Sequence, residues 1–329
     1  MKTAVVLFNL GGPDSLEAVE PFLRNLFSDP AIIGLPNPLR WLIAKLISSR
    51  RVKTAQAIYA QIGGKSPLRE LTEEQAVALQ ARLNDDALQA RLNDDGAGDY
   101  RTFVAMRYWH PFADETAQAV AAYAPDKIVL LPLYPQYSKT TTGSSFKDWA
   151  RATAAIGLTK PTLTVRDYPE HPGYIAALAG QLRQSLTEVR QKGPFRLLFS
   201  AHGLPKKVID SGDPYQTQIE RTAAAIVGAL GKDAEGLDWR VCYQSRVGPL
   251  EWIGPSTDDE IKRAGREALS LVLLPIAFVS EHSETLVELD IEYRELAAHH
   301  GVPFYLRVPA LGTDRSFIVA LADLVRQAG

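Results

Sequence analysis

A short stretch near the end of the chain concentrates acidic residues and a histidine at spacings that could do chemistry. In LPIAFVSEHSETLVELDIEYRE, an apolar run is followed by Glu281, His282 and Glu284 within four positions, and then by Glu288 and Glu292 at a step of four. In an α-helix over residues 284–295, the step of four aligns Glu284, Glu288 and Glu292, so that neighbouring carboxylates repel. The helix dipole favours acids at a helix start, but it does not account for acids two turns further along. The ridge therefore predicts a path for a cation or for protons, with a solvated acidic face as the alternative.

A second histidine, His202 in SAHGLP, also follows a strand-like apolar run, at 195–201. A lone histidine is more often structural, but parallel strands bring their ends to one edge, where His202 and the acids can converge. Imidazole with carboxylate suits iron, zinc or nickel. The spacing is not that of a closed zinc site, so we expect an open, weakly held metal. A neutral imidazole, with a pKa near ~6.5, can also accept a proton. We predict His202 and Glu284 as catalytic and metal-binding residues, with Glu284 as metal ligand or proton relay.

Strand-like runs alternate with helical periodicity along the whole chain. The first half carries such runs at 2–8, 101–106, 127–133 and 162–166, and the second half at 195–201, 239–243, 270–278 and 304–308. This alternation predicts an α/β fold with two parallel sheets, each doubly wound with helices. In such sheets ligands bind beyond the carboxyl ends of the strands.

The two halves also resemble each other. YIAALAGQLRQ at 174–184 and FIVALADLVRQ at 317–327 share six of eleven residues at an offset of 143, and IVLLPLY at 128 matches LVLLPIAF at 271 at the same offset. PTLTVRDYP at 161 and PFYLRVPA at 303 lie close to the same offset. Chance likeness of apolar segments would explain one match but not three. We predict a first half over 1–192 and a second over 193–329 that carries His202 and Glu284, with terminal helices free to pack across the boundary.

A shorter repeat is of a different kind. ALQARLNDD occurs at 78–86 and again, unchanged, at 87–95. Nine residues turn an α-helix by about half a revolution, so Leu79 and Leu83 would face away from Leu88 and Leu92. We therefore expect a helix extension or a surface loop with no part in the chemistry.

Composition excludes several classes of protein. A formal charge of -2 gives no electrostatic footprint for nucleic acid, and the chain lacks the glycine-rich nucleotide-binding motifs. One cysteine, Cys242, rules out an intramolecular disulfide and fits a reducing compartment. The apolar start of the chain runs directly into a glycine turn, without the pattern of a signal peptide, and no apolar run reaches the ~20 residues of a spanning helix. We expect a cytoplasmic enzyme.

Motifs along nearly the whole chain resemble the ferrochelatase family. They are LFNLGGPDS, QIGGKSPL, RYWHPF, YPQYSKTTTGSSF, LLFSAHGLP, GDPY, YQSRVGPLEWIGPSTDD and PIAFVSEHSETLVELDIEY. The resemblance implies two chelatase-like α/β halves with a porphyrin cleft between them. It also implies a lyase that inserts Fe(II) into protoporphyrin IX, releases two protons and completes haem synthesis.

The resemblance assigns roles to residues as well. The family's motif histidine corresponds to His202 and its metal-handling or proton-handling glutamate to Glu284, with His282 beside it and Glu288 and Glu292 lining the cleft. The family's porphyrin contacts correspond to five further residues: Arg51, Tyr59, Ser66, Arg107 and Tyr108.

One family feature is missing from the printed sequence. Some relatives hold a [2Fe-2S] cluster through a cysteine-rich tail and a further cysteine at the position of Lys139, but no cysteine lies beyond Cys242 here. We therefore expect no cluster and no permanently bound cofactor, with Fe(II) and porphyrin as substrates.

The segment PLRWLIAKLIS, residues 38–48, predicts an amphipathic helix with Trp41 beside its apolar face. A packed helix is the ordinary interpretation. Since porphyrin is apolar and membrane-associated, we favour a lip that closes over the substrate and touches the membrane surface peripherally.

Two other functions remain open at this point. One is a bilobal binding protein for a metal or a haem-like ligand, which would normally be exported. The other is a chelatase that acts on cobalt or on a reduced ring. The residues do not decide between protoporphyrin and coproporphyrin, for which the resemblance favours the former, nor do they give the oligomeric state.

Overall fold

A computed structural model of the chain describes residues 1–92, 98–246 and 250–328. These residues form two compact units. Unit 1 consists of Met1–Tyr134, Ser138–Asp167 and Ile318–Gly329, and unit 2 consists of Pro135–Tyr137 and Tyr168–Phe317. In the part of the chain that is described, none of the helices is long and apolar enough to cross a membrane.

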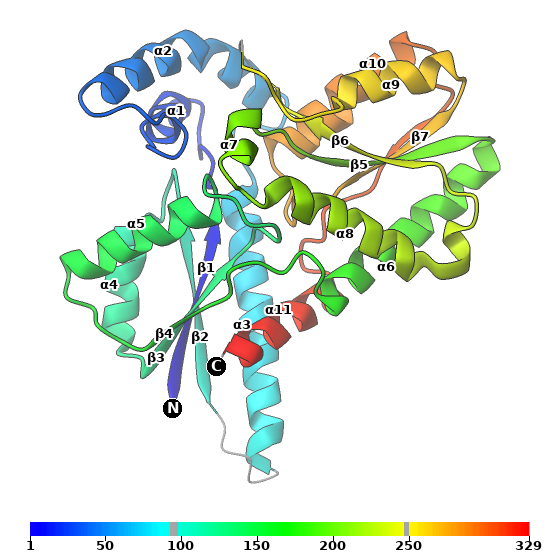
Figure 1. Cartoon of the computed structure of the whole chain (residues 1–329). Helices are drawn as coiled ribbons and strands as arrows, with labels where there is room; N and C mark the ends of the chain where they lie inside the picture. Colours follow the sequence, from blue (N-terminus) through cyan, green and yellow to red (C-terminus); the bar gives the residue numbers. More distant parts are fainter. Residues whose placement is uncertain (93–97, 247–249, 329) are drawn as a thin grey trace. The chain divides into compact units, whose positions relative to one another are not determined.

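Unit 1 is built on a parallel four-stranded sheet with the order β2-β1-β3-β4. Its strands are β1 (Lys2–Asn9), β2 (Asp99–Met106), β3 (Lys127–Pro132) and β4 (Thr162–Thr164). Its helices are α1 (Val19–Phe27), α2 (Leu39–Ala60), α3 (Leu68–Leu92), α4 (Ala113–Tyr123), α5 (Thr142–Ala155) and most of α11 (Arg315–Ala328). The central β1 is buried from Thr3 to Asn9, as expected where helices cover both faces of a sheet (Figure 1).

Unit 2 repeats this plan with the strand order β6-β5-β7-β8. Its strands are β5 (Phe195–His202), β6 (Trp239–Gln244), β7 (Ser270–Pro275) and β8 (Tyr305–Arg307). Its α-helices are α6 (Pro172–Val189), α7 (Lys206–Asp210), α8 (Tyr215–Leu230), α9 (Thr257–Arg266) and α10 (Tyr293–His299). Two short 3-10 turns, η1 (Arg190–Lys192) and η2 (Gly231–Ala234), and a π-helix, η3 (Glu284–Glu292), complete it.

The two sheets confirm the predicted fold class. In each unit the first strand pairs in parallel with the second and the third, and the fourth strand pairs with the third. Every strand overlaps one of the predicted apolar runs, and the largest difference is β7, which ends at Pro275 where the sequence predicted strand to residue 278.

The units are not simple halves of the sequence. α6 belongs to unit 2 although it precedes residue 192, and α11 from Ile318 onward belongs to unit 1. These two helices carry the repeated motifs that the sequence places at the ends of its two halves. The boundary at residue 192 stays a prediction about the duplication and differs from this compact division.

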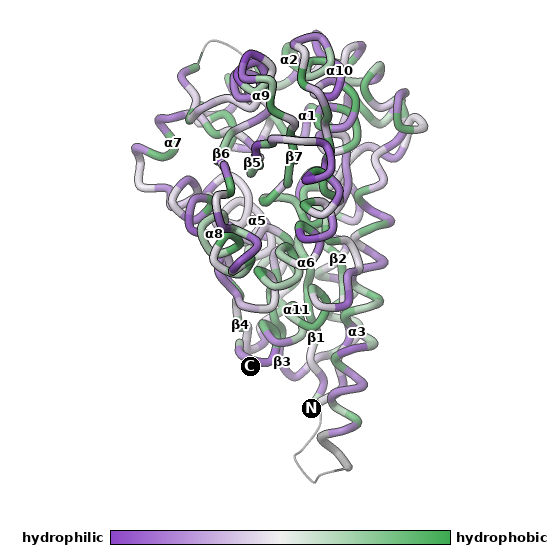
Figure 2. The backbone as a smooth tube through the Cα atoms, turned by 90° about the vertical axis from the view of Figure 1, so that its right-hand side faces the viewer, coloured by the Kyte–Doolittle hydropathy of each residue, from purple (hydrophilic) through white to green (hydrophobic). Residues whose placement is uncertain are grey.

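The nine-residue repeat lengthens α3, as the helix-extension alternative predicted. Leu79 and Leu83 are 0% and 1% exposed, whereas Leu88 is 54% exposed. Figure 2 shows hydrophilic and hydrophobic residues mixed along α3. The end of the second copy, residues 93–95, lies outside the described residues, as do residues 247–249 of the YQSRVGP motif.

Candidate active site

The strand β5 places His202 at the carboxyl edge of the unit 2 sheet. The strand is central, paired with β6 and β7, and buried from Arg196 to Ala201. The chain must turn closely here, because a Cβ at Gly203 would lie 2.9 Å from the carbonyl oxygen of Gln244. The Tyr215 hydroxyl donates to the His202 carbonyl at 3.1 Å. These contacts fix the backbone of His202 and leave its side chain 37% exposed.

The acidic stretch follows β7, the neighbour of β5, and forms a π-helix rather than the predicted α-helix. The Thr285 hydroxyl accepts from the His282 N–H at 2.9 Å and donates to the His282 carbonyl at 3.1 Å. The π-helix η3 then covers Glu284–Glu292 before α10 begins. π-Helices are rare in proteins, and those that occur often lie at functional sites. Their wider turn still places residues four apart on neighbouring positions of one side.

The structure brings His202 and Glu284 together. The His202 Nδ1 lies 3.0 Å from the Glu284 Oε2, and the His282 Nε2 lies 3.8 Å from the same oxygen. Burial alone would lower the pKa of His202, but the Glu284 carboxylate outweighs it and raises that pKa above its ordinary value. Burial likewise opposes the charge on Glu284, yet the two histidines hold the pKa of Glu284 well below its usual range. Glu284 is therefore ionised at neutral pH.

Glu288 is the next acid along η3 and is held by residues at the end of β6. Its Oε1 accepts from the Ser245 N–H at 2.8 Å and from the Tyr293 hydroxyl at 3.1 Å, and its Oε2 accepts from the Gln244 amide at 3.3 Å and from the Ser245 hydroxyl. Burial and the nearby Glu284 charge raise the pKa of Glu288. Burial and the Glu284 charge thus favour the protonated form of Glu288.

Exposure increases along the row towards its end. Glu284 and Glu288 are half-buried, whereas Glu292 is exposed. Glu281 takes no part in this row, because its Oε1 accepts from Arg307 at 2.8 Å and from the Ala310 N–H at 2.9 Å. The ridge thus runs from the His202 contact to solvent, and Glu281 anchors the segment that precedes it.

Within the described ranges, no group of three or more histidine, cysteine and acidic side chains has the geometry of a metal site. The contact between His202 and Glu284 offers one imidazole and one carboxylate, with His282 adjacent. These donors would leave coordination positions of an ion open.

The predicted porphyrin contacts Arg51, Tyr59 and Ser66 all belong to unit 1. Arg51 is exposed on α2, with its guanidinium 5.9 Å from the centre of the Phe27 ring. Tyr59 and Ser66 are 7% and 5% exposed. Ser66 lies against Gly12, where an added Cβ would lie 2.4 Å from the Ser66 oxygen. Of the three side chains, therefore, only that of Arg51 is charged and exposed to solvent.

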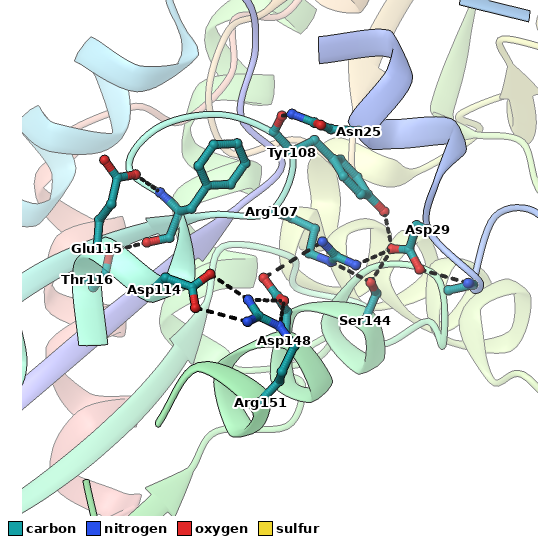
Figure 3. A network of polar contacts seen from close by, with 12 residues as sticks. Asn25, Asp29, Arg107, Tyr108, Asp114, Glu115, Thr116, Ser144, Asp148 and Arg151 are labelled. Carbon is teal, nitrogen blue, oxygen red and sulfur yellow. Dashed lines mark hydrogen bonds and ion pairs between the residues drawn. The ribbon is translucent and has the colours of Figure 1, made fainter. Parts of the chain in front are cut away.

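The predicted contacts Arg107 and Tyr108 are joined through Asp29 (Figure 3). The Tyr108 hydroxyl donates to the Asp29 Oδ2 at 2.7 Å, and the Arg107 Nη2 lies 2.9 Å from the same oxygen. The Ser144 hydroxyl also donates to the Asp29 Oδ2 and accepts from the Arg107 Nε at 2.7 Å. Burial and the Asp29 charge raise the pKa of Tyr108. Their part in porphyrin binding stays a prediction.

Sequence reasoning missed Ser245 and Asp29. Ser245 has a positive φ of 60° directly after β6, and both its N–H and its hydroxyl serve Glu288. A polar residue just after a predicted strand was the available signal for Ser245. Asp29 gave no such signal, because its side-chain partners are distant in sequence.

Comparison with known proteins identifies the family that this chain resembles over its whole length. The ferrochelatase family model matches residues 2–329. The ferrochelatase of Phenylobacterium zucineum is 58% identical over 98% of this chain and 90% of its own, and that of a Wolbachia strain from Drosophila simulans is 49% identical over 98% of both. Among solved structures, SirB from Bacillus subtilis with Fe3+ has a TM-score of 0.53 at 13% identity, covering 100% of this chain and 96% of its own. That likeness concerns the fold alone.

Proposed function

The chain belongs to the ferrochelatase family, whose members insert Fe(II) into protoporphyrin IX to form haem, and we propose the following roles for its residues in this reaction. His202 accepts protons from the pyrrole nitrogens, and Glu284 orients it. The observation that carries this proposal is the 3.0 Å contact between the His202 Nδ1 and the Glu284 Oε2 at the edge of the unit 2 sheet.

The contact favours one tautomer of His202. When its Nδ1–H donates to the ionised Glu284, the lone pair on the Nε2 becomes the proton acceptor. The carboxylate also stabilises the imidazolium that forms when a proton is taken up, which is the expected cause of the raised pKa of His202. The released protons then have Glu288, whose pKa is also raised, as a nearby acceptor.

Fe(II) is a substrate that the enzyme must transfer to the ring. Tight binding of the metal before transfer would stabilise the ground state and slow the reaction. We propose that His202 and Glu284 hold it briefly, with His282 beside them, and that Glu288 and Glu292 form a path for the ion or for protons. The rise in exposure from Glu288 to Glu292 supports this direction.

We propose Arg51, Tyr59, Ser66, Arg107 and Tyr108 as porphyrin contacts. The exposed Arg51 suits a propionate, because a guanidinium can bind a carboxylate with two parallel hydrogen bonds. The other four are largely buried and are suited to shaping the binding surface rather than to attracting charge.

The lip on α2 is part of the proposal. Leu39, Trp41, Leu42 and Leu46 are 47%, 51%, 58% and 49% exposed, while Ala44 and Ser48 are buried. The start of α2 thus buries small side chains and exposes four large apolar ones, which supports a lip. A patch of this kind beside basic side chains suits an apolar macrocycle and the surface of a membrane. We propose a cytoplasmic enzyme that contacts the membrane peripherally.

We further propose that no [2Fe-2S] cluster is bound by this chain. Such a cluster is held by several thiolates, and the sequence contains one cysteine. Burial raises the pKa of Cys242 to about 12, so this thiol stays protonated inside unit 2.

One assay tests the activity. The purified protein, protoporphyrin and Fe(II) are mixed without oxygen, and porphyrin fluorescence is followed. Catalytic loss of fluorescence over many turnovers supports the proposal. A single stoichiometric loss would indicate a binding protein, and turnover with Co(II) but not with Fe(II) would indicate a different chelatase.

A further inference from the structure

Asp29 is a buried carboxylate that accepts from two separate parts of unit 1. It lies just after α1 and is 3% exposed. Its Oδ2 accepts from Tyr108, Arg107 and Ser144, which come from the end of β2 and from α5 (Figure 3). Its Oδ1 accepts from the Ala31 N–H at 2.8 Å. Four donors saturate one carboxylate, as expected for a charge removed from water.

The same residue folds the segment that leads to the lip. The Asp29 carbonyl accepts from the Ile32 N–H at 3.0 Å and from the Ile33 N–H at 2.9 Å. This turn starts residues 30–38, where Ile32 and Leu35 are 40% and 37% exposed. One end of Asp29 therefore fixes the start of an exposed apolar segment, and the other end fixes Arg107 and Tyr108.

The surrounding charges show that Arg107 is used within the fold. Its Nη2 binds Asp29, its Nη1 lies 3.8 Å from Asp148, and its Nε donates to Ser144. Arg151 binds Asp114 and Asp148 beside it. Two guanidinium groups thus face three carboxylates. A cluster with excess negative charge does not attract a propionate, so Arg107 contributes to porphyrin binding through its position rather than as a free cation.

We propose that Asp29 is a positioning residue for porphyrin binding. It connects Arg107 and Tyr108 to the turn at 29–33. In this way it holds residues 30–38, which lead to the lip on α2, in the conformation that binds the porphyrin. This inference rests on the proposed function, in which the lip and Arg107 contact porphyrin. Asp29 itself touches neither the porphyrin nor the metal.

The test compares Asp29→Asn, which keeps the shape but removes the charge, with Ser144→Ala, which removes one neutral donor. A matched control is Asp238→Asn in unit 2, which breaks the ion pair with the buried Arg196, 2.7 Å away. For Asp29→Asn we expect the KM for protoporphyrin to rise about tenfold, with the KM for Fe(II) and kcat kept within about twofold. Amide exchange at residues 31–33 should accelerate. Ser144→Ala should show the same pattern more weakly, and Asp238→Asn should not show it.

Three outcomes would overturn the proposal: an unchanged porphyrin KM in a folded Asp29→Asn protein, equal changes in both KM values and kcat, or the same porphyrin effect in the Asp238→Asn control. If Asp29→Asn does not fold, Ser144→Ala decides by the same criteria. If the unaltered protein fails to insert iron, the proposed function fails instead, while amide exchange at 31–33 still reports whether Asp29 holds the turn.

Discussion

At the scale of single residues, the chemistry depends on His202, on whose protonation burial and a neighbouring carboxylate have opposite effects. Burial disfavours the imidazolium of His202, and the Glu284 carboxylate 3.0 Å away favours it more strongly. The equivalent last residue of the central strand in unit 1 is Asn9. Its side-chain Nδ2 donates to the Thr72 hydroxyl at 3.0 Å, and its side-chain Oδ1 accepts from the Leu10 N–H at 2.8 Å. The same strand position therefore serves structure in one unit and is available for chemistry in the other.

Replacing His202 by alanine should remove the proton acceptor without removing core volume. We expect kcat to fall at least about a hundredfold, which is the lower range for loss of a general base. Porphyrin affinity should stay near that of the unaltered protein, and so should the unfolding midpoint at a pH above the raised pKa of His202, where the contact with Glu284 no longer adds stability. Steady-state kinetics, porphyrin fluorescence titration and thermal unfolding measure these quantities. Substantial remaining turnover would show that another group accepts the protons.

The raised pKa of His202 sets the direction of a pH dependence. The stability that His202 gains from Glu284 is fully present below the ordinary pKa of ~6.5 and is lost as pH rises through the raised value. Activity runs in the opposite direction, because only the neutral imidazole accepts a proton. We expect kcat/KM to rise with pH through a pKa above the ordinary histidine value. In Glu284→Gln, only the Glu288 charge still opposes the effect of burial on His202, so the rise should move to lower pH, and an unmoved profile would contradict the assignment.

At the scale of elements, the sequence predicted the strands well and the site only in part. Short apolar runs mark the positions of β1 to β8 because the apolar pattern of a strand is local in sequence. The π-helix η3 could not be predicted, since the same apolar spacing supports i to i+4 and i to i+5 hydrogen bonds. Asp29 escaped notice because its partners Tyr108 and Ser144 lie 79 and 115 residues away in the chain. The contact between Ser245 and Glu288 was missed for the same reason, because 43 residues separate them in the chain.

The row of acids on η3 predicts a specific kinetic split. Combining Glu288→Gln with Glu292→Gln should raise the KM for Fe(II) severalfold and leave porphyrin affinity unchanged, because the path loses its charges but the lip does not change. Glu284→Gln should in addition lower kcat. The matched control is Glu295→Gln, an exposed acid on α10 outside the row. If the double variant only gains stability while iron kinetics stay the same, the row is a solvated acidic face.

At the scale of the whole molecule, the two units share one strand order but differ in what joins their first two strands. Between β1 and β2 the chain forms α1, α2 and α3, whereas between β5 and β6 it forms α7 and α8 with the short turn η2. The long insertion of unit 1 carries the exposed apolar residues of the lip. Unit 2 carries the His202 and Glu284 pair instead. The two units therefore share one strand order and carry different features between their first two strands.

The lip should decide how the whole protein associates with a membrane. Trp41 and Leu42 are 51% and 58% exposed, and the Lys45 ammonium lies 5.5 Å from the centre of the Trp41 ring. Apolar and cationic groups together favour the surface of anionic bilayers. We expect Trp41→Ala with Leu42→Ala to weaken sedimentation with anionic liposomes at least about fivefold, since burying each side chain contributes roughly 1.5–3 kcal/mol. Leu88→Ala, an equally exposed leucine on α3, is the control and should have no effect. Equal binding by both variants would place any membrane contact elsewhere and leave the lip to the porphyrin alone.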